Sequence, residues 1–160
     1  MTIKIFTTGG TIDKIYFDAK STYQIGDPQI TRLLAEARFT LDCSVTSLMR
    51  KDSLEMTDAD RQIVVEAVRR EPAKRILITH GTDTMLLTAE ALRQIPDKTM
   101  VLTGAMQPAR FHSSDAIFNI GFALAAVQLL PPGAYVTMNG EVFEPGKARK
   151  NIDAGRFERL

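Results

Sequence analysis

The sequence KRILITHGTDT, residues Lys74–Thr84, shows most clearly how the chain is organised. Residues 74–79 centre on a short, continuous apolar run, which is typical of a central strand in a parallel sheet. A glycine-containing loop follows, and the pattern from about Thr84 to Gln94 predicts a helix. The stretch therefore predicts one strand–loop–helix unit of an α/β fold.

The same order of strand, loop and helix recurs along the chain of 160 residues. The sequence predicts strands at 2–8, 74–79, 99–104 and 134–140, β-rich sequence at 39–49, helices at 27–38, 57–70, 84–94 and 114–130, and loops at 9–26 and 105–115. Strands that alternate with helices predict a three-layer α/β fold, in which a mostly parallel sheet is flanked by helices. The length suits a single domain, residues 1–160.

Three of the predicted helices carry a start signal. Asp27–Pro28 reads as an N-cap followed by a proline at the first helical position. Thr57 and Asp60 have the spacing of a capping box. Ser113 or Ser114 is expected to cap the last helix.

Composition and charge exclude several classes of partner. Twenty basic residues against nineteen acidic give a net charge of +1, so neither nucleic acid nor an anionic membrane is expected as a partner. The longest apolar segment is too short and too polar to span a bilayer. The chain has one cysteine, Cys43, and its start lacks the apolar core of a signal peptide. We therefore expect a cytoplasmic protein.

Glycines and hydroxyl side chains gather where three predicted strands end. The segments are TGGT (8–11), HGTDT (80–84) and TGAM (103–106). In parallel sheets ligands bind at the carboxyl ends of the strands. The sequence therefore predicts a site built from these three loops.

Standard cofactor and metal motifs do not fit these loops. TGGT lacks the spacing of a dinucleotide fingerprint, and the chain has no P-loop and no G-x-S-x-G elbow. His80 and His112 are far apart in the sequence and form no ligand cluster. HSSD (112–115) contains the letters of a catalytic triad, but adjacent residues do not converge as a triad must. We expect no cofactor and no metal.

The remaining candidate chemistry is nucleophilic attack by a threonine hydroxyl. The glycine pair before Thr11 lets the backbone turn tightly and approach a substrate. An alcohol needs a base or a charge network to become a nucleophile, and Asp83 at the end of another strand offers a charge. TGGT alone, or the loop with Asp83 alone, is more often a plain turn, whereas the two together are a specific signal of a functional site.

The two segments IFTTGGTID (5–13) and ITHGTDTM (78–85) resemble the signature motifs of the bacterial-type L-asparaginase family. Further similarity lies at STYQIG (21–26), at TGAMQP (103–108) and between Glu141 and Lys150. The resemblance covers essentially the whole chain in the family's order. It implies the fold of that family's amino-terminal, catalytic-residue-bearing domain.

The resemblance also implies catalytic roles. Thr11 matches the nucleophile, Tyr23 matches the tyrosine that assists it, and Thr82 with Asp83 matches the second threonine and the aspartate. A lysine completes the set. Its expected place is Lys150. Lys147 is the competing choice if the last loop is shifted by three residues.

For substrate binding the resemblance implies Gly10, Ser53 and Ala105, together with Thr82 and Asp83. The serine matches the family's contact to the substrate α-carboxylate. The next residue is usually glutamine in the family, but here it is leucine, which changes how that carboxylate would be held.

The implied function is hydrolysis of L-asparagine to L-aspartate and ammonia through a threonine acyl-enzyme, with L-glutamine as a slower substrate. Two alternatives are a non-catalytic amino-acid-binding module and an amidotransferase-type domain of the same family. Most family members carry a second, carboxy-terminal domain that this sequence lacks, so the chain is expected to be a short member or an amino-terminal domain.

Assembly is predicted from the helix at 114–130. Its apolar residues occupy more than one helical face, so one sheet surface should not cover them all. The expected state is a homo-oligomer, a dimer or a tetramer, whose site a neighbouring subunit completes. The residues concerned are Ile117, Phe118, Ile120, Phe122, Leu124, Val127, Leu129 and Leu130.

Overall fold

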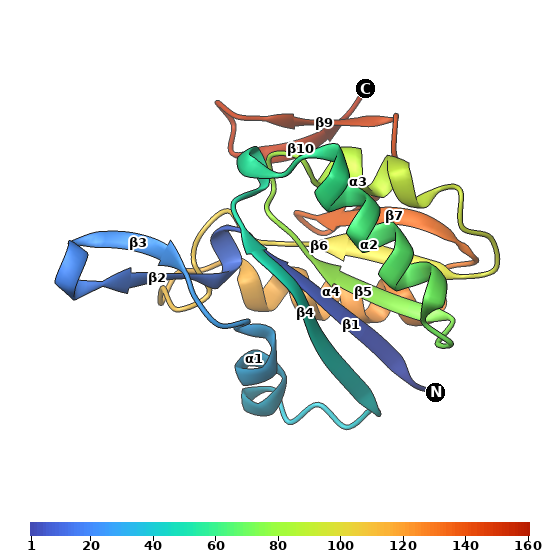
Figure 1. The fold of residues 1–160 in the computed structure, drawn as a ribbon, viewed down its shortest axis with the longest axis horizontal. Coiled ribbons are helices and arrows are strands. Elements are labelled where there is room, and N and C mark those ends of the chain that lie inside the picture. Colours follow the sequence, from blue (N-terminus) through green and yellow to red (C-terminus); the bar gives the residue numbers. More distant parts are fainter.

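A computed structural model describes residues 1–160 and contains a central sheet of six strands in the order β4-β1-β5-β6-β7-β8 (Figure 1). All neighbouring pairs are parallel except β7 and β8, which form an antiparallel hairpin. The mostly parallel sheet predicted from the sequence is therefore confirmed. The strands are β1 (Ile3–Gly9), β4 (Cys43–Lys51), β5 (Arg75–Thr79), β6 (Thr99–Thr103), β7 (Gly133–Met138) and β8 (Glu141–Phe143).

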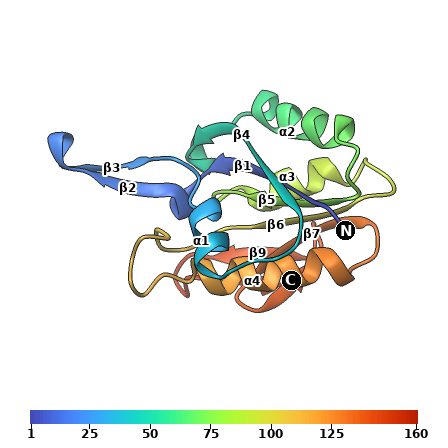
Figure 2. The same ribbon diagram turned by 90° about the horizontal axis from the view of Figure 1, so that it is seen from below.

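Helices cover both faces of this sheet, which gives the predicted three layers (Figure 2). On one side lie α2 (Asp58–Arg70) and α3 (Met85–Leu92), and on the other lie α1 (Ile30–Glu36) and α4 (Ala116–Leu129). None of the helices is long and apolar enough to cross a membrane.

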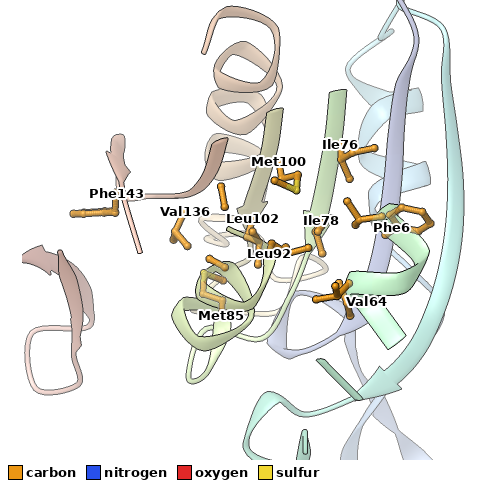
Figure 3. Packing of buried hydrophobic residues seen from close by; sticks show 14 of the residues in the cluster. Phe6, Val64, Ile76, Ile78, Met85, Leu92, Met100, Leu102, Val136 and Phe143 are labelled. Carbon is orange, nitrogen blue, oxygen red and sulfur yellow. The ribbon is translucent and has the colours of Figure 1, made fainter. Parts of the chain in front are cut away.

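Alternation along the strands fills the two cores. On β5, Ile76 and Ile78 point into the cluster formed with α2 and α3 (Figure 3), and Leu77 points into the cluster formed with α1 and α4. All three side chains are fully buried. A strand buried on both faces carries a nearly continuous apolar run, which explains Ile76–Ile78 in the sequence.

The connections place a topological switch point between β1 and β5. After β1 the chain passes α1 and adds β4 on one side of it, whereas after β4 it passes α2 and returns to add β5 on the other side. In open α/β sheets a crevice forms outside the carboxyl ends of the strands at such a point. TGGT follows β1 and HGTDT follows β5, so both motifs lie at this switch point.

Two local predictions have opposite outcomes. The capping box is confirmed, because the Thr57 side chain accepts from Asp60 N while the Asp60 carboxylate accepts from Thr57 N. The cap at Asp27 is wrong, since α1 begins at Ile30 with Gln29 as its N-cap residue. Asp27 instead forms an ion pair with Arg50 at 2.7 Å.

Residues 9–26 are not a plain loop, so this prediction is also wrong. A 3₁₀ turn (Thr11–Asp13) leads into an antiparallel hairpin of β2 (Lys14–Phe17) and β3 (Thr22–Ile25), joined by a second 3₁₀ turn (Asp18–Lys20). The hairpin extends away from the body in both views (Figures 1 and 2). Its strands pair only with each other, so no core-facing pattern identifies them in the sequence.

A second hairpin, also absent from the sequence expectations, closes the described chain. It consists of β9 (Ala148–Asn151) and β10 (Arg156–Arg159), which form a separate two-stranded sheet. A third 3₁₀ turn (Ser53–Glu55) follows β4.

Candidate active site

The glycine pair brings the loops after β1 and β5 into backbone contact. Gly9 and Gly10 have φ of 99° and 89°, a region that L side chains rarely adopt. A Cβ atom on Gly10 would lie only 2.5 Å from the backbone nitrogen of Gly81. The Gly10 N–H donates to the Lys51 carbonyl at 2.9 Å, which fixes the turn. Thr11 therefore stands next to the loop that carries Thr82.

Lys150 joins this loop from the far end of the chain. Its ammonium donates to the Thr82 hydroxyl oxygen at 2.8 Å and lies 2.6 Å from the Asp83 carboxylate. Lys147, the competing lysine, lies 2.6 Å from Glu144 and is exposed. The structure thus brings together Thr82, Asp83 and Lys150, three of the residues singled out in the sequence.

The β9–β10 hairpin positions Lys150. Phe157 is the cross-strand partner of Lys150, is buried, and packs on Phe143 with ring centroids 6.1 Å apart. Its backbone N–H donates to the side-chain oxygen of Asn139 at 2.9 Å. These contacts dock the hairpin against the β7–β8 turn, so that Lys150 reaches the end of β5.

Ser53 holds the backbone of the loop that carries Thr82 and Asp83. Its side chain is buried, and its hydroxyl oxygen accepts from the backbone N–H groups of Asp83 at 3.2 Å and Thr84 at 3.4 Å. A Cβ on Gly81 would lie 2.6 Å from this oxygen. The neighbouring Leu54 is exposed, at 74%. Ser53 therefore contacts the backbone that carries Asp83.

His80 is a buried, neutral support for the loop. Its Nδ1 lies 2.8 Å from the Gly81 carbonyl and its Nε2 lies 2.8 Å from the Thr88 hydroxyl. Burial lowers the pKa of His80 to about 4. A neutral ring with both nitrogens engaged orients the loop.

The third loop, with Ala105, is held by α4. Both carboxylate oxygens of Asp115 accept from the Met106 N–H, and one accepts from the Gln107 N–H. The buried Asn119 amide donates to the Gly104 carbonyl at 3.0 Å. Ala105 itself is buried. All three motif loops therefore have defined supports at one end of the sheet.

Tyr23 lies apart from the other candidates. It sits on β3 with half of its side chain exposed, and its ring packs edge-on against Tyr16 at 5.4 Å and Phe111 at 5.8 Å. The hydrogen bonds of the site include neither its hydroxyl nor that of Thr11. The structure therefore places Tyr23 on the projecting hairpin and does not join it to Thr11.

Comparison with known proteins shows the family of the chain. The family model described as "Asparaginase, N-terminal" matches residues 2–157. The chain belongs to the asparaginase family. A glutaminase-asparaginase of Acinetobacter glutaminasificans is 27% identical over 165 residues, which cover 94% of this chain and 50% of that protein.

A component of the glutamyl-tRNA(Gln) amidotransferase of Methanococcus vannielii is 40% identical over 85 residues, covering 50% of this chain and 20% of that protein. The thermostable L-asparaginase from Thermococcus kodakarensis has a TM-score of 0.83 at 26% identity, covering 100% of this chain and 51% of that one. The chain thus spans about half the length, or less, of these relatives.

Several supporting residues were missed in the sequence. Asn139 precedes Gly140, and an Asn-Gly pair between apolar stretches is a strong hairpin signal that would have located β8. Asp115 appeared only as part of HSSD. No local pattern identifies Asp13, whose burial depends on the hairpin described above.

Proposed function

We propose that the chain is the catalytic domain of an amidohydrolase that converts L-asparagine to L-aspartate and ammonia, and L-glutamine more slowly. The observation that carries the proposal is the hydrogen-bonded set of Lys150, Thr82 and Asp83 beside the turn that presents Thr11. Membership of the asparaginase family supports the reaction class.

Thr11 acts as the nucleophile in this proposal. Its hydroxyl oxygen attacks the side-chain amide carbon, and the hydroxyl proton is passed to the amide nitrogen. The C–N bond then breaks, and ammonia leaves an ester on Thr11. Water then adds to the ester, and cleavage of its C–O bond gives L-aspartate and restores the hydroxyl. Backbone N–H groups at the Gly10 and Thr82 loops are suited to stabilise the oxyanion.

Lys150 sets the direction of proton movement. An ammonium has donors only, so the Thr82 oxygen must accept from it, and the hydroxyl hydrogen of Thr82 is free to point elsewhere. The Asp83 carboxylate holds the ammonium in place. We infer that Thr82 relays the proton from the Thr11 hydroxyl to the nitrogen of the substrate amide.

Substrate binding is assigned to the surrounding loops. Asp83 is partly exposed and carries the charge that suits a substrate ammonium group. Gly10 and Ala105 would line the pocket with backbone. Ser53 would hold the substrate α-carboxylate after its hydroxyl leaves the backbone contacts it makes here.

The hairpin is proposed to be a lid. The exposed strand β3 carries Tyr23, and closure over the carboxyl end of the sheet would bring that hydroxyl to Thr11. Lids of this kind exclude water and complete a catalytic set.

Ammonia release from L-asparagine by the purified protein tests the proposal directly. We expect turnover with L-asparagine, slower turnover with L-glutamine, and none with L-aspartate. Binding of L-asparagine without ammonia release would favour an amino-acid-binding module instead.

A second candidate is an amide-hydrolysing domain of an amidotransferase. The 40% identity to the amidotransferase component of Methanococcus vannielii supports it. Turnover of L-glutamine that exceeds turnover of L-asparagine would favour this second function.

We propose further that the protein is cytoplasmic and assembles as a homo-oligomer, a dimer or a tetramer. The exposed face of α4 supports assembly. Ile117, Phe118 and Leu129 are 49%, 59% and 83% exposed, and α4 carries no charged residue. Apolar surface of this kind commonly marks a contact between proteins.

A further inference from the structure

Asp13 is a buried carboxyl group that the proposed reaction does not use. It lies two residues after Thr11, at the point where the chain leaves the body to enter the β2–β3 hairpin. Its side chain is 2% exposed. One carboxylate oxygen accepts from the backbone N–H of Gln29 at 2.9 Å, just beyond the point where the hairpin returns.

The backbone of Asp13 is engaged on both sides as well. Its N–H donates to the Gly10 carbonyl at 3.1 Å, and its carbonyl accepts from the Gly26 N–H at 2.8 Å. One residue thus ties together the turn before Thr11, the outgoing strand and the returning strand.

Neither of the two nearby ion pairs includes Asp13. Arg50, whose charge acts on Asp13, forms its ion pair with Asp27. Lys14, the next residue along the chain, is paired with Asp52 at 3.1 Å. Both pairs link the base of the hairpin to the end of β4.

Two further cations face this region from other elements. Arg32 on α1 and Arg110 on the loop after β6 both donate to the side-chain oxygen of Gln29, at 3.3 and 3.1 Å. Both guanidinium groups thus bind the side chain of Gln29, whereas the Asp13 carboxylate accepts from the backbone N–H of Gln29.

Burial without an ion pair makes the charged form of Asp13 costly. Burial raises the pKa of Asp13 to about 7, against the lowering effects of the Gln29 N–H and of Arg50. Between pH 4 and 7 the folded chain therefore binds a proton that the unfolded chain does not, and the free energy of unfolding falls as the pH rises. An asparagine would avoid this cost and keep an acceptor oxygen.

We propose that Asp13 is a positioning residue whose buried carboxylate anchors the returning end of the hairpin, and so sets Tyr23 relative to Thr11. A charged acceptor holds an N–H group more firmly than a neutral one. The inference rests on the proposed function for its link to catalysis, whereas the anchoring itself does not.

Amide hydrogen exchange at Gln29 and Gly26 tests the anchor. Corrected for intrinsic rates, Asp13→Asn should exchange about tenfold faster than the wild type at pH 8, and the wild type at pH 6 should approach the variant. Asp153→Asn, which removes an exposed carboxylate, is the control and should change neither rate.

Two further readouts separate positioning from bulk stability. At pH 8 the Tm of Asp13→Asn should lie above that of the wild type, with the difference shrinking at pH 5, while kcat for asparagine falls. The decline of wild-type kcat below about pH 7 should be missing in the variant.

Unchanged exchange at Gln29 in Asp13→Asn, or unchanged kcat at pH 8, would overturn the inference. A wild type that releases no ammonia at all would refute the proposed function, and the exchange rates would still decide whether Asp13 anchors the hairpin.

Discussion

Lys150 and Thr82 lie 68 positions apart, and the ammonium of one donates a 2.8 Å hydrogen bond to the hydroxyl of the other. Alternation along β9 makes this contact selective. Arg149 turns to the opposite face, where it pairs with Glu158. Lys150 is thus the residue of this strand directed at the β5 loop.

Removal of this ammonium should therefore be damaging. We expect Lys150→Met and Asp83→Asn each to lower kcat about 10²- to 10⁴-fold, the range for loss of a proton-transfer group. Lys147→Met is the matched control, because that lysine pairs with Glu144 at the surface, and its kcat should stay at the wild-type value. Steady-state ammonia release measures all three. A damaging Lys147→Met with a neutral Lys150→Met would contradict the assignment.

Thr11→Val should abolish turnover and leave the fold intact. The change removes the hydroxyl but keeps the branched shape of a half-buried side chain. Ammonia release should fall to background while the circular dichroism spectrum and Tm stay close to those of the wild type. Thr8→Val serves as the comparison, because that hydroxyl donates to the Thr79 carbonyl and has no role in the proposed reaction. Activity near the wild-type level in Thr11→Val would remove Thr11 as the nucleophile.

His80 should make the fold acid-sensitive. Its pKa is about 4 in the folded chain, against 6.5 for the ordinary side chain. Between these values the unfolded chain binds a proton that the folded chain does not, so the free energy of unfolding falls as the pH drops from 6.5 to 4. The loss is on the order of 3 kcal/mol.

Denaturant unfolding of the wild type and His80→Gln at several pH values measures this effect. The comparison is made between the two proteins because Asp13 titrates in an overlapping window with the opposite sign. The stability advantage of the wild type over His80→Gln should shrink toward pH 4. An advantage that is constant across the window would show that His80 does not titrate as expected.

Charges on the exposed face of α4 should dissociate the assembly. Ile117→Lys and Leu129→Lys place an ammonium on apolar positions that are 49% and 83% exposed. Sedimentation velocity should show an oligomer for the wild type and smaller species for these variants. Leu87→Lys, on α3 at 56% exposure, is the matched control and should leave the oligomer unchanged. An active wild-type monomer would refute the assembly and the idea that a neighbouring subunit completes the site.

The layered sheet could be predicted because its signals are local. A buried strand such as β5 has a nearly continuous apolar run, and the capping box at Thr57 and Asp60 lies within four residues. The meeting of the TGGT and HGTDT loops followed from a general property of parallel sheets.

The two outlying hairpins could not be predicted in the same way. Tyr16 and Tyr23 pair across a hairpin with one strand exposed on both faces, so no alternation distinguishes it from a loop. The start of α1 was misplaced because the N–H of Gln29 is satisfied by Asp13, which lies 16 positions earlier in the chain. Contacts of this kind depend on the finished fold.

The separate β9–β10 sheet makes the site depend on how one hairpin is docked. The Thr11 turn and the parallel strands β1, β4, β5, β6 and β7 are built from residues before 140, whereas Lys150 is held at Thr82 by the docking of Phe157 on Phe143 and Asn139. If the proposed function holds, a molecule with this hairpin undocked would keep the Thr11 turn but lack the ammonium beside Thr82, so detachment of one short hairpin should silence the site while the sheet stays folded.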